Sequence, residues 1–341
     1  MDTETLRATG RELVAPGKGI LAADESSGTI KKRFDSIGVE STEDNRRAYR
    51  DLLFTTPNLS DHVSGVILFD ETIRQAAHDA APFPQQLAAA GMIPGIKVDT
   101  GAKPLAGYPG ETVTEGLDGL RERLSEYREL GARFAKWRAT IYCGAALPTA
   151  GAIHANAHAM ARYAALCQEA GIVPIVEPEV LMDGAHSIDD CEDATQRTLL
   201  ALYAELTDAR VDLPGSLLKV NMVLSGTDAS ARADHHQVAE ATVRCLTANV
   251  PDDVPGIVFL SGGQSDLDAT IHLNEMNTLG PHPWELSFSY GRALQSPALA
   301  AWGGAPANVQ AGQRALAHRA RMNGLARDGK YSVDLESSTA T

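Results

Sequence analysis

Short apolar runs alternate with longer amphipathic stretches along almost the whole chain. Each run is a few residues long and is bounded by glycine, proline or charged residues, which is typical of buried strands in a parallel sheet. Eight runs of this kind predict strands, at residues 19–24, 65–70, 93–99, 132–138, 172–179, 216–223, 256–261 and 284–289.

The stretches between these runs carry the signals of helix beginnings and ends. Ser41 with Asp44, and Ser265 with Asp268, have the spacing of capping boxes. Gly131 follows a stretch with leucines at helical spacing, a position where a left-handed residue commonly ends a helix. The pattern therefore predicts helices between the strands.

This alternation favours right-handed crossovers between parallel strands, and eight such units close into a barrel. We therefore predict an α/β fold, a single (β/α)8 TIM barrel over residues 1–327 with an N-terminal helical extension. Residues 328–341 are rich in serine and threonine and are predicted to form a flexible C-terminal tail.

The run at residues 216–223 contains a charged residue, Lys219, in an otherwise mostly apolar strand. A lysine in such a place either pairs with a partner or loses its proton, because burial disfavours the ammonium form. The neutral amine of a lysine is a nucleophile. Lys219 is therefore a candidate nucleophile, although a lone lysine in a strand more often extends its side chain to solvent.

The chemistry of a (β/α)8 barrel lies at the carboxyl ends of its strands, and the predicted strands carry polar residues there. Residues two apart on a strand point to the same side, so paired polar residues project together. Burying so many charges would cost too much for packing alone, which predicts an active site in the barrel mouth. The polar residues are Asp24 with Ser26, Lys97 with Asp99, Lys136 with Arg138, Glu177 with Glu179, Lys219, Ser261 to Gly263, and Ser289 to Arg292.

Two groups of residues have the character of anion sites. The segment 261–263, with Arg292 at the start of a helix, offers backbone N–H groups and a guanidinium to a phosphate. Arg33, Ser26 and Lys97 form a second group, which we expect on the far side of the mouth. A substrate with a phosphate at each end would fit this arrangement.

Composition excludes some partners. The formal net charge of −14 argues against a nucleic acid or an anionic membrane as partner. No run approaches the roughly 18 apolar residues of a membrane span, and the N-terminus lacks the pattern of a signal peptide. The four scattered cysteines indicate reduced thiols in a cytoplasmic protein.

The motifs at the strand ends resemble those of class I fructose-bisphosphate aldolases. The resemblance extends from about residue 10 to Lys330, and it is carried by GILAADESS (19–27), IKVD (96–99), FAKWR (134–138), VEPE (176–179), LLKVNM (217–222), LSGGQ (260–264) and SFSYGRALQ (287–295). It implies reversible cleavage of fructose 1,6-bisphosphate into dihydroxyacetone phosphate and glyceraldehyde 3-phosphate, in glycolysis or gluconeogenesis. It also implies a Schiff base with no metal and no other cofactor.

The resemblance implies a role for each catalytic residue. Lys219 would attack the C2 carbonyl, Glu177 would move protons, and Asp24 would lie beside the bond that breaks. Lys136 would stabilise charge near the reacting carbons, and Glu179 would orient Lys136.

The resemblance also implies how the substrate and the subunits are bound. It implies a homotetramer. One phosphate would bind Ser261, Gly262, Ser289, Gly291 and Arg292, the other would bind Arg33, Ser26 and Lys97, and Gly263 and Arg138 would be further substrate-binding residues.

Three features depart from the family pattern. Val220 stands where the family has proline, and Thr100 stands where many members have lysine. The chain ends in Thr341, whereas animal members end in a tyrosine that folds back over the site.

Two other functions are compatible with the sequence. One is a metal-dependent lyase on the same barrel, but zinc needs histidine ligands and no predicted strand ends in one. His154 and His158 are four residues apart, but they lie in a predicted helix without an adjacent glutamate. The other is a barrel that binds sugar phosphates without catalysis, which the presence of Lys219, Glu177 and Lys136 disfavours.

Overall fold

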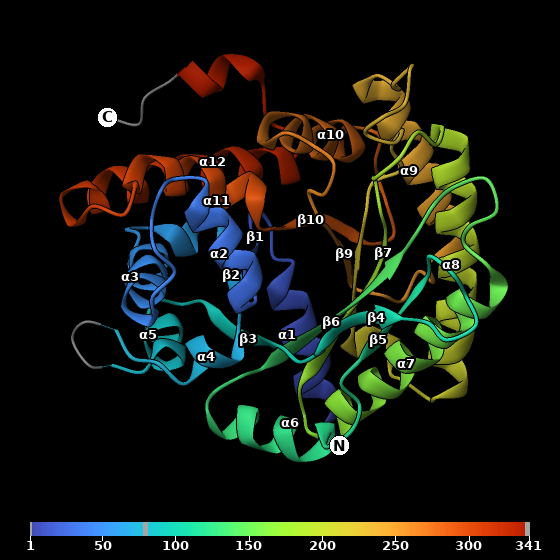
Figure 1. The fold of residues 1–341 in the computed structure, drawn as a ribbon, viewed down its shortest axis with the longest axis horizontal. Coiled ribbons are helices and arrows are strands. Elements are labelled where there is room, and N and C mark those ends of the chain that lie inside the picture. Colours follow the sequence, from blue (N-terminus) through green and yellow to red (C-terminus); the bar gives the residue numbers. More distant parts are fainter. Residues whose placement is uncertain (1, 78–80, 338–341) are drawn as a thin grey trace.

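The computed structural model describes residues 2–77 and 81–337, and within them eight parallel strands close into a barrel (Figure 1). The order around the barrel is β1-β10-β9-β8-β7-β6-β3-β2, and β1 pairs with both β2 and β10 to close it. The predicted (β/α)8 TIM barrel is confirmed. The barrel strands are β1 (Gly19–Ala23), β2 (Val63–Leu68), β3 (Ile93–Lys97), β6 (Phe134–Ile141), β7 (Val173–Val180), β8 (Leu217–Val220), β9 (Gly256–Phe259) and β10 (Glu285–Tyr290).

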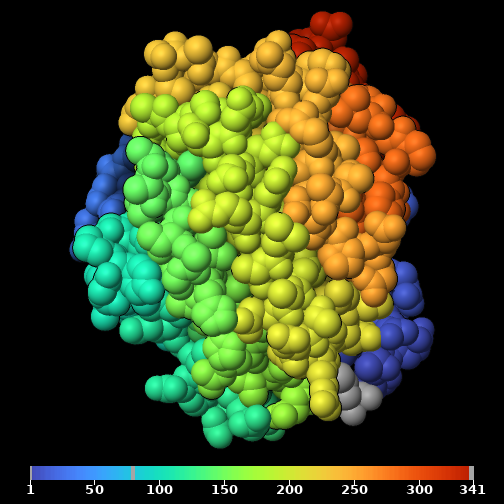
Figure 2. Space-filling model, turned by 90° about the vertical axis from the view of Figure 1, so that its right-hand side faces the viewer, coloured from blue at the N-terminus to red at the C-terminus, as the bar shows by residue number. Residues whose placement is uncertain are grey.

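Helices surround the barrel, and α7, α8 and α9 lie side by side over one of its sides (Figure 2). Four short 3₁₀ turns occur within the described residues: η1 (Leu59–Asp61), η2 (Leu213–Gly215), η3 (Pro306–Asn308) and η4 (Val333–Ser337). The α-helices are α1 (Thr3–Leu13), α2 (Ser27–Asp35), α3 (Glu43–Phe54), α4 (Asp70–Ile73), α5 (Phe83–Ala89), α6 (Leu120–Glu129), α7 (Ala150–Glu169), α8 (Ile188–Asp208), α9 (His235–Asn249), α10 (Asp266–Thr278), α11 (Arg292–Trp302) and α12 (Val309–Arg327).

Of the two helix caps predicted from the sequence, the structure contains the one at Ser265 but not the one at Ser41. Ser265 caps α10, since its hydroxyl accepts a hydrogen bond from the backbone N–H of Asp268 at 3.0 Å, but the Asp268 carboxylate bonds the Ser265 hydroxyl and does not complete the capping box. The cap predicted at Ser41 is wrong. Thr42 begins α3 instead, because its hydroxyl accepts the backbone N–H of Asn45 at 3.2 Å.

A hairpin that the sequence pattern did not predict follows β3. It pairs β4 (Gly101–Pro104) with β5 (Thr112–Glu115) in antiparallel fashion. Asn156 on α7 holds it: its side-chain oxygen accepts Thr114 N–H at 3.2 Å, and its amide donates to the Thr112 carbonyl at 2.8 Å. The hairpin begins where β3 ends and therefore lies beside the barrel mouth.

An apolar cluster fills the lumen at the amino ends of the strands. Residues from α1 and just after it cover this end, so the lumen is closed there by packed side chains. The polar groups at the other end are therefore separated from solvent on this side. The cluster contains Leu6, Leu13, Val14, Ile20, Ala22, Ile67, Phe134, Val173, Ile175, Leu217 and Val258.

Gly95 on β3 faces the ring of Phe134 and leaves no space for a side chain. A Cβ atom at Gly95 would lie 2.3 Å from Phe134 Cζ. We therefore expect Gly95→Ala to lower the free energy of unfolding by about 1–3 kcal/mol, measured from urea denaturation. Gly28→Ala is the matched control, because nothing lies within 4 Å of a Cβ atom there. Equal unfolding midpoints for the two variants would contradict the prediction.

The C-terminal segment packs near α12 as far as the structure describes it. The Tyr331 hydroxyl donates to Glu336 Oε1 at 2.9 Å, and Arg319 Nη1 donates to the same oxygen at 2.6 Å. Residues 338–341 of the predicted tail lie outside the described residues. The predicted flexibility of 328–341 stays a prediction.

Within the described residues, no helix combines the length and the apolar character needed to cross a bilayer.

Candidate active site

A cavity of about 320 Å³ lies at the carboxyl ends of the barrel strands. The closed parallel barrel brings residues from distant parts of the chain to this one place. Nearly all of the predicted site residues line it: Asp24, Ser26, Arg33, Lys97, Lys136, Arg138, Glu177, Glu179, Lys219, Ser261, Gly262, Ser289, Gly291 and Arg292.

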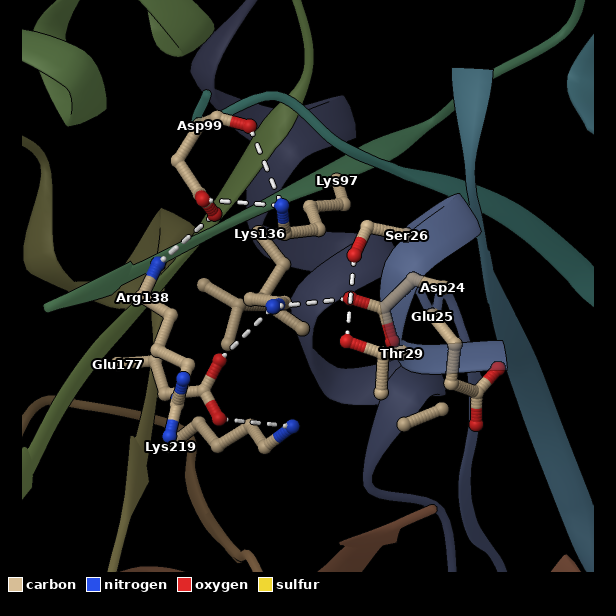
Figure 3. A network of polar contacts seen from close by, with 12 residues as sticks. Asp24, Glu25, Ser26, Thr29, Lys97, Asp99, Lys136, Arg138, Glu177 and Lys219 are labelled. Atoms are coloured by element: carbon tan, nitrogen blue, oxygen red, sulfur yellow. Dashed lines mark hydrogen bonds and ion pairs between the residues drawn. The ribbon is translucent and has the colours of Figure 1, made fainter. Parts of the chain in front are cut away.

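Four of these side chains form a continuous chain of ion pairs (Figure 3). Lys219 Nζ lies 3.0 Å from Glu177 Oε1, and Glu177 Oε2 lies 3.1 Å from Lys136 Nζ. Lys136 Nζ also lies 2.9 Å from Asp24 Oδ2. Cations and carboxylates alternate, so each buried charge has a partner of opposite sign.

The side-chain alternation of the strands explains why these groups meet. On three neighbouring strands, an apolar residue of the lumen cluster is followed two positions later by a charged residue. Both therefore face the lumen, with the charged residue nearer the carboxyl end. The pairs are Phe134 and Lys136 on β6, Ile175 and Glu177 on β7, and Leu217 and Lys219 on β8.

For the ion-paired side chains Asp24, Lys136 and Glu177, burial and neighbouring charges shift the pKa in opposite directions. Burial alone would lower the pKa of Lys136, but the carboxylates of Asp24 and Glu177 outweigh it and raise that pKa. Burial alone would raise the pKa of both Asp24 and Glu177, but the attraction of Lys136 and Lys219 lowers it. Near neutral pH Lys136 is therefore an ammonium and both carboxyl groups are ionised.

The partner of Glu179 differs from the expected one. Its carboxylate accepts a hydrogen bond from Arg138 Nε, not from Lys136. Lys136 is held by Asp24 and Glu177 instead. Among the described residues Glu179 therefore has no direct ion pair with Lys136, and the expectation that it orients Lys136 stays a prediction.

A cradle for an anion lies where β9 and β10 end. The Ser289 hydroxyl is buried at the cavity and has no hydrogen-bond partner in the part of the chain that the structure describes. Gly291 precedes α11 and provides no side-chain cap, which leaves N–H groups of the first turn free for a ligand. Arg292 forms no ion pair with any described residue, although it lines the cavity. An unpaired hydroxyl, a helix N-terminus and an unpaired guanidinium fit a phosphate.

All three residues of the second predicted anion group, Arg33, Ser26 and Lys97, line the same cavity. Lys97 Nζ lies 3.0 Å from Asp99 Oδ1, and the Ser26 hydroxyl is 3.2 Å from that of Thr29 (Figure 3). The Arg33 guanidinium also lies close to the cradle, since a Cβ atom at Gly291 would lie 3.5 Å from Arg33 Nη2.

The family model for class I fructose-bisphosphate aldolases matches residues 5–341. The chain belongs to this family. The resemblance drawn from the strand-end motifs is therefore confirmed, and the protein is an enzyme of the aldehyde-lyase type. Its barrel is the fold of this family.

Individual relatives agree with the family assignment. The chain is 58% identical over 332 residues to a probable fructose-bisphosphate aldolase class 1 of Xanthomonas axonopodis pv. citri, covering 97% of this chain and 99% of that protein. It is 55% identical over 328 residues to fructose-bisphosphate aldolase 1 of Toxoplasma gondii, covering 96% and 90%. A solved Plasmodium falciparum fructose-bisphosphate aldolase, in complex with TRAP and a small-molecule inhibitor, is 49% identical with a TM-score of 0.96, and covers 97% of this chain and 96% of its own.

One predicted aldolase site residue does not line the cavity. Gly263 packs against Met182, and a Cβ atom there would lie 2.4 Å from Met182 Cβ. Its φ of +74° is also one that glycine adopts readily. Gly263 therefore shapes the turn after β9, and Ser261 and Gly262 are the members of this motif that face the cavity.

Sequence reasoning missed three polar residues that line the cavity, Glu25, Thr29 and Thr140. Thr140 continues the alternation of Lys136 and Arg138 on β6, so strand spacing alone would have identified it. Glu25 directly follows Asp24, and two adjacent acidic residues at a strand end were a usable signal.

Proposed function

We propose that this aldolase cleaves fructose 1,6-bisphosphate reversibly through a Schiff base on Lys219. The supporting observation is the 3.0 Å contact of the Lys219 amine with Glu177 in a pocket where both side chains are at most 5% exposed. A lysine nucleophile must lose its proton before it attacks, and a carboxylate in contact can accept it. Both side chains line the cavity.

Attack begins at the C2 carbonyl of the open-chain sugar. The Lys219 nitrogen bonds to C2 and forms a carbinolamine, whose hydroxyl leaves as water after Glu177 returns a proton. The product is a protonated imine between Lys219 and C2. Glu177 can serve both transfers because its carboxylate lies between Lys219 and Lys136.

Cleavage then breaks the bond between C3 and C4. A carboxylate removes the proton of the C4 hydroxyl, the C4–O bond becomes a carbonyl, and the bonding electrons move into the imine to give an enamine. Glyceraldehyde 3-phosphate leaves, the enamine takes a proton at C3, and hydrolysis releases dihydroxyacetone phosphate. The carboxylates of Glu177 and Asp24 and the fixed ammonium of Lys136 surround this step.

The ends of the substrate would be held by the phosphate groups. Ser261, Gly262, Ser289, Gly291 and Arg292 would bind one phosphate, and Ser26 and Lys97 would bind the other, with Arg33 beside the cradle. We further propose a cytoplasmic homotetramer that acts in glycolysis or gluconeogenesis, without a cofactor and without a nucleic-acid partner.

Trapping with borohydride tests this proposal against a metal-dependent lyase. Borohydride reduces an imine, so treatment with dihydroxyacetone phosphate should inactivate the enzyme and add the mass of one reduced triose phosphate. Activity and trapping should be unchanged after chelator treatment. Activity that is lost with the chelator and restored by a divalent metal would favour the metal-dependent alternative.

His154 and His158 lie away from the site of the proposed chemistry. His154 and His158 lie on the exposed side of α7, where both contact Glu205 on α8, at 3.1 Å and 2.9 Å. Neither lines the cavity that holds Lys219.

A further inference from the structure

Behind the cavity, one buried carboxylate connects three helices. Glu25 Oε1 accepts hydrogen bonds from Arg33 on α2 and from Gln295 Nε2 on α11, the latter at 2.9 Å. Glu25 Oε2 accepts a hydrogen bond from Arg50 Nη2 on α3 at 2.6 Å. Figure 3 shows the Glu25 carboxylate turned away from Lys136, so it is not part of the chain of catalytic ion pairs.

The two arginines bound to Glu25 differ in what they can reach. The Arg33 side chain is 20% exposed and lines the cavity beside Gly291. The Arg50 side chain is 3% exposed and does not line the cavity. A substrate phosphate can therefore contact Arg33, whereas Arg50 contacts Glu25 and does not line the cavity.

The charges of this cluster do not cancel. Counted as ions, Arg33 and Arg50 carry two positive charges and Glu25 carries one negative charge, which leaves +1. Without Arg50, Glu25 and Arg33 would form a neutral pair. A neutral pair in a poorly solvated place attracts a phosphate far less than a net cation does.

The buried guanidinium of Arg50 destabilises the fold at this position. Its guanidinium lies 5.9 Å from the centre of the buried Tyr49 ring, and its Nη1 has no hydrogen-bond partner among the described residues. A buried donor without a partner destabilises a fold. An apolar side chain would fill the same space at a lower cost, so packing does not explain the charge.

We propose that Arg50 is a positioning residue for phosphate binding: its buried charge occupies Glu25, so that Arg33 stays available to bind a phosphate of the substrate. This inference rests on the proposed cleavage of a sugar bisphosphate. It means that Arg50 affects substrate affinity without touching the substrate.

Two variants separate the charge of Arg50 from its shape. Arg50→Gln keeps a hydrogen-bond donor toward Glu25 but removes the charge, and Arg50→Lys keeps the charge. We expect the KM for fructose 1,6-bisphosphate to rise about tenfold in Arg50→Gln, the size of one charge-assisted hydrogen bond. We expect it to stay within about threefold of wild type in Arg50→Lys, with kcat nearly unchanged in both. An unchanged KM in a folded Arg50→Gln enzyme overturns the proposal.

A double-mutant cycle with Arg33 tests whether Arg50 acts through it. Arg33→Met should raise KM about tenfold in the wild-type background but less than about threefold in the Arg50→Gln background. A merely structural role of Arg50 would instead make the two effects multiply. Multiplying effects therefore overturn the proposal.

Arg50→Gln leaves Glu25 with one cation fewer, so a second variant keeps the test decisive if Arg50→Gln does not fold. Glu25→Gln combined with Arg50→Gln removes both buried charges and leaves Arg33 as the remaining cation of the cluster. The proposal then expects a KM within about threefold of wild type, and a rise above tenfold overturns it.

Trapping by borohydride distinguishes this inference from the proposed function. At saturating dihydroxyacetone phosphate, every folded variant should be trapped as fully as wild type. If the wild-type enzyme is not trapped, the proposed Schiff base on Lys219 is wrong, and this inference fails with it. If the wild-type enzyme and Arg50→Gln are both trapped normally and KM is unchanged in Arg50→Gln, only the proposed role of Arg50 is wrong.

Discussion

Lys219→Met is expected to lower kcat by about 10⁴-fold or more and to abolish borohydride trapping with dihydroxyacetone phosphate. The thioether has nearly the shape of the lysine stem but cannot form an imine. Its side chain would occupy the same buried place, so the fold should persist although Glu177 loses one of its two cations. Trapping is measured as the mass of the reduced adduct on the intact chain.

Lys97→Met is the matched control for this experiment. Lys97 also lines the cavity, but it pairs with Asp99 at 3.0 Å and does not contact Glu177. Its variant should still be trapped in full and should mainly show a higher KM. If Lys219→Met formed as much adduct as wild type, another amine would be the nucleophile.

Glu177→Gln is expected to lower kcat by about 10²–10⁴-fold, the usual range for loss of a general acid–base group. The amide keeps the size of the side chain, but it cannot take a proton from Lys219 or return one to the carbinolamine. The substitution also removes the negative charge that lies between Lys136 and Lys219. Steady-state kinetics measure the effect, and thermal unfolding confirms that the variant is folded.

Glu179→Gln is the control for that prediction, because it changes the same residue type two positions along β7. Glu179 pairs with Arg138 rather than with either lysine, so we expect a smaller loss in kcat than for Glu177→Gln. A kcat within about threefold of wild type in Glu177→Gln would remove Glu177 from the proton-transfer steps.

The fold and most of the site could be predicted because they depend on local signals. Each barrel strand is an apolar run with polar residues at its carboxyl end, and strand alternation decides which side chains share the lumen. Lys136, Glu177 and Lys219 therefore face one cavity for reasons that are visible in the sequence.

The choice of partners inside the cavity could not be predicted in the same way. Alternation shows that Glu179 faces the lumen, but the register of β6 against β7 sets it opposite Thr140, and the side chain of Arg138 reaches it diagonally. Arg33 lies by the cradle because Glu25 binds it, and Glu25 is itself held by Arg50 on another helix. Such contacts depend on tertiary packing and leave no periodic signal.

The hairpin of β4 and β5 was missed for a related reason. Its strands are only four residues long, and its fixing contact comes from the amide of Asn156 on α7, far along the chain. Short strands at the surface lack the apolar run that marks a buried strand.

The closure of one end of the barrel by α1 has a consequence for turnover. Because Leu6, Leu13 and Val14 seal that end, the described residues leave the mouth at the opposite end as the passage for substrate and products. In the proposed Schiff-base mechanism, the ketone half of the sugar stays attached to Lys219 after cleavage. The unattached aldehyde half would therefore leave first, through the same mouth by which the substrate entered.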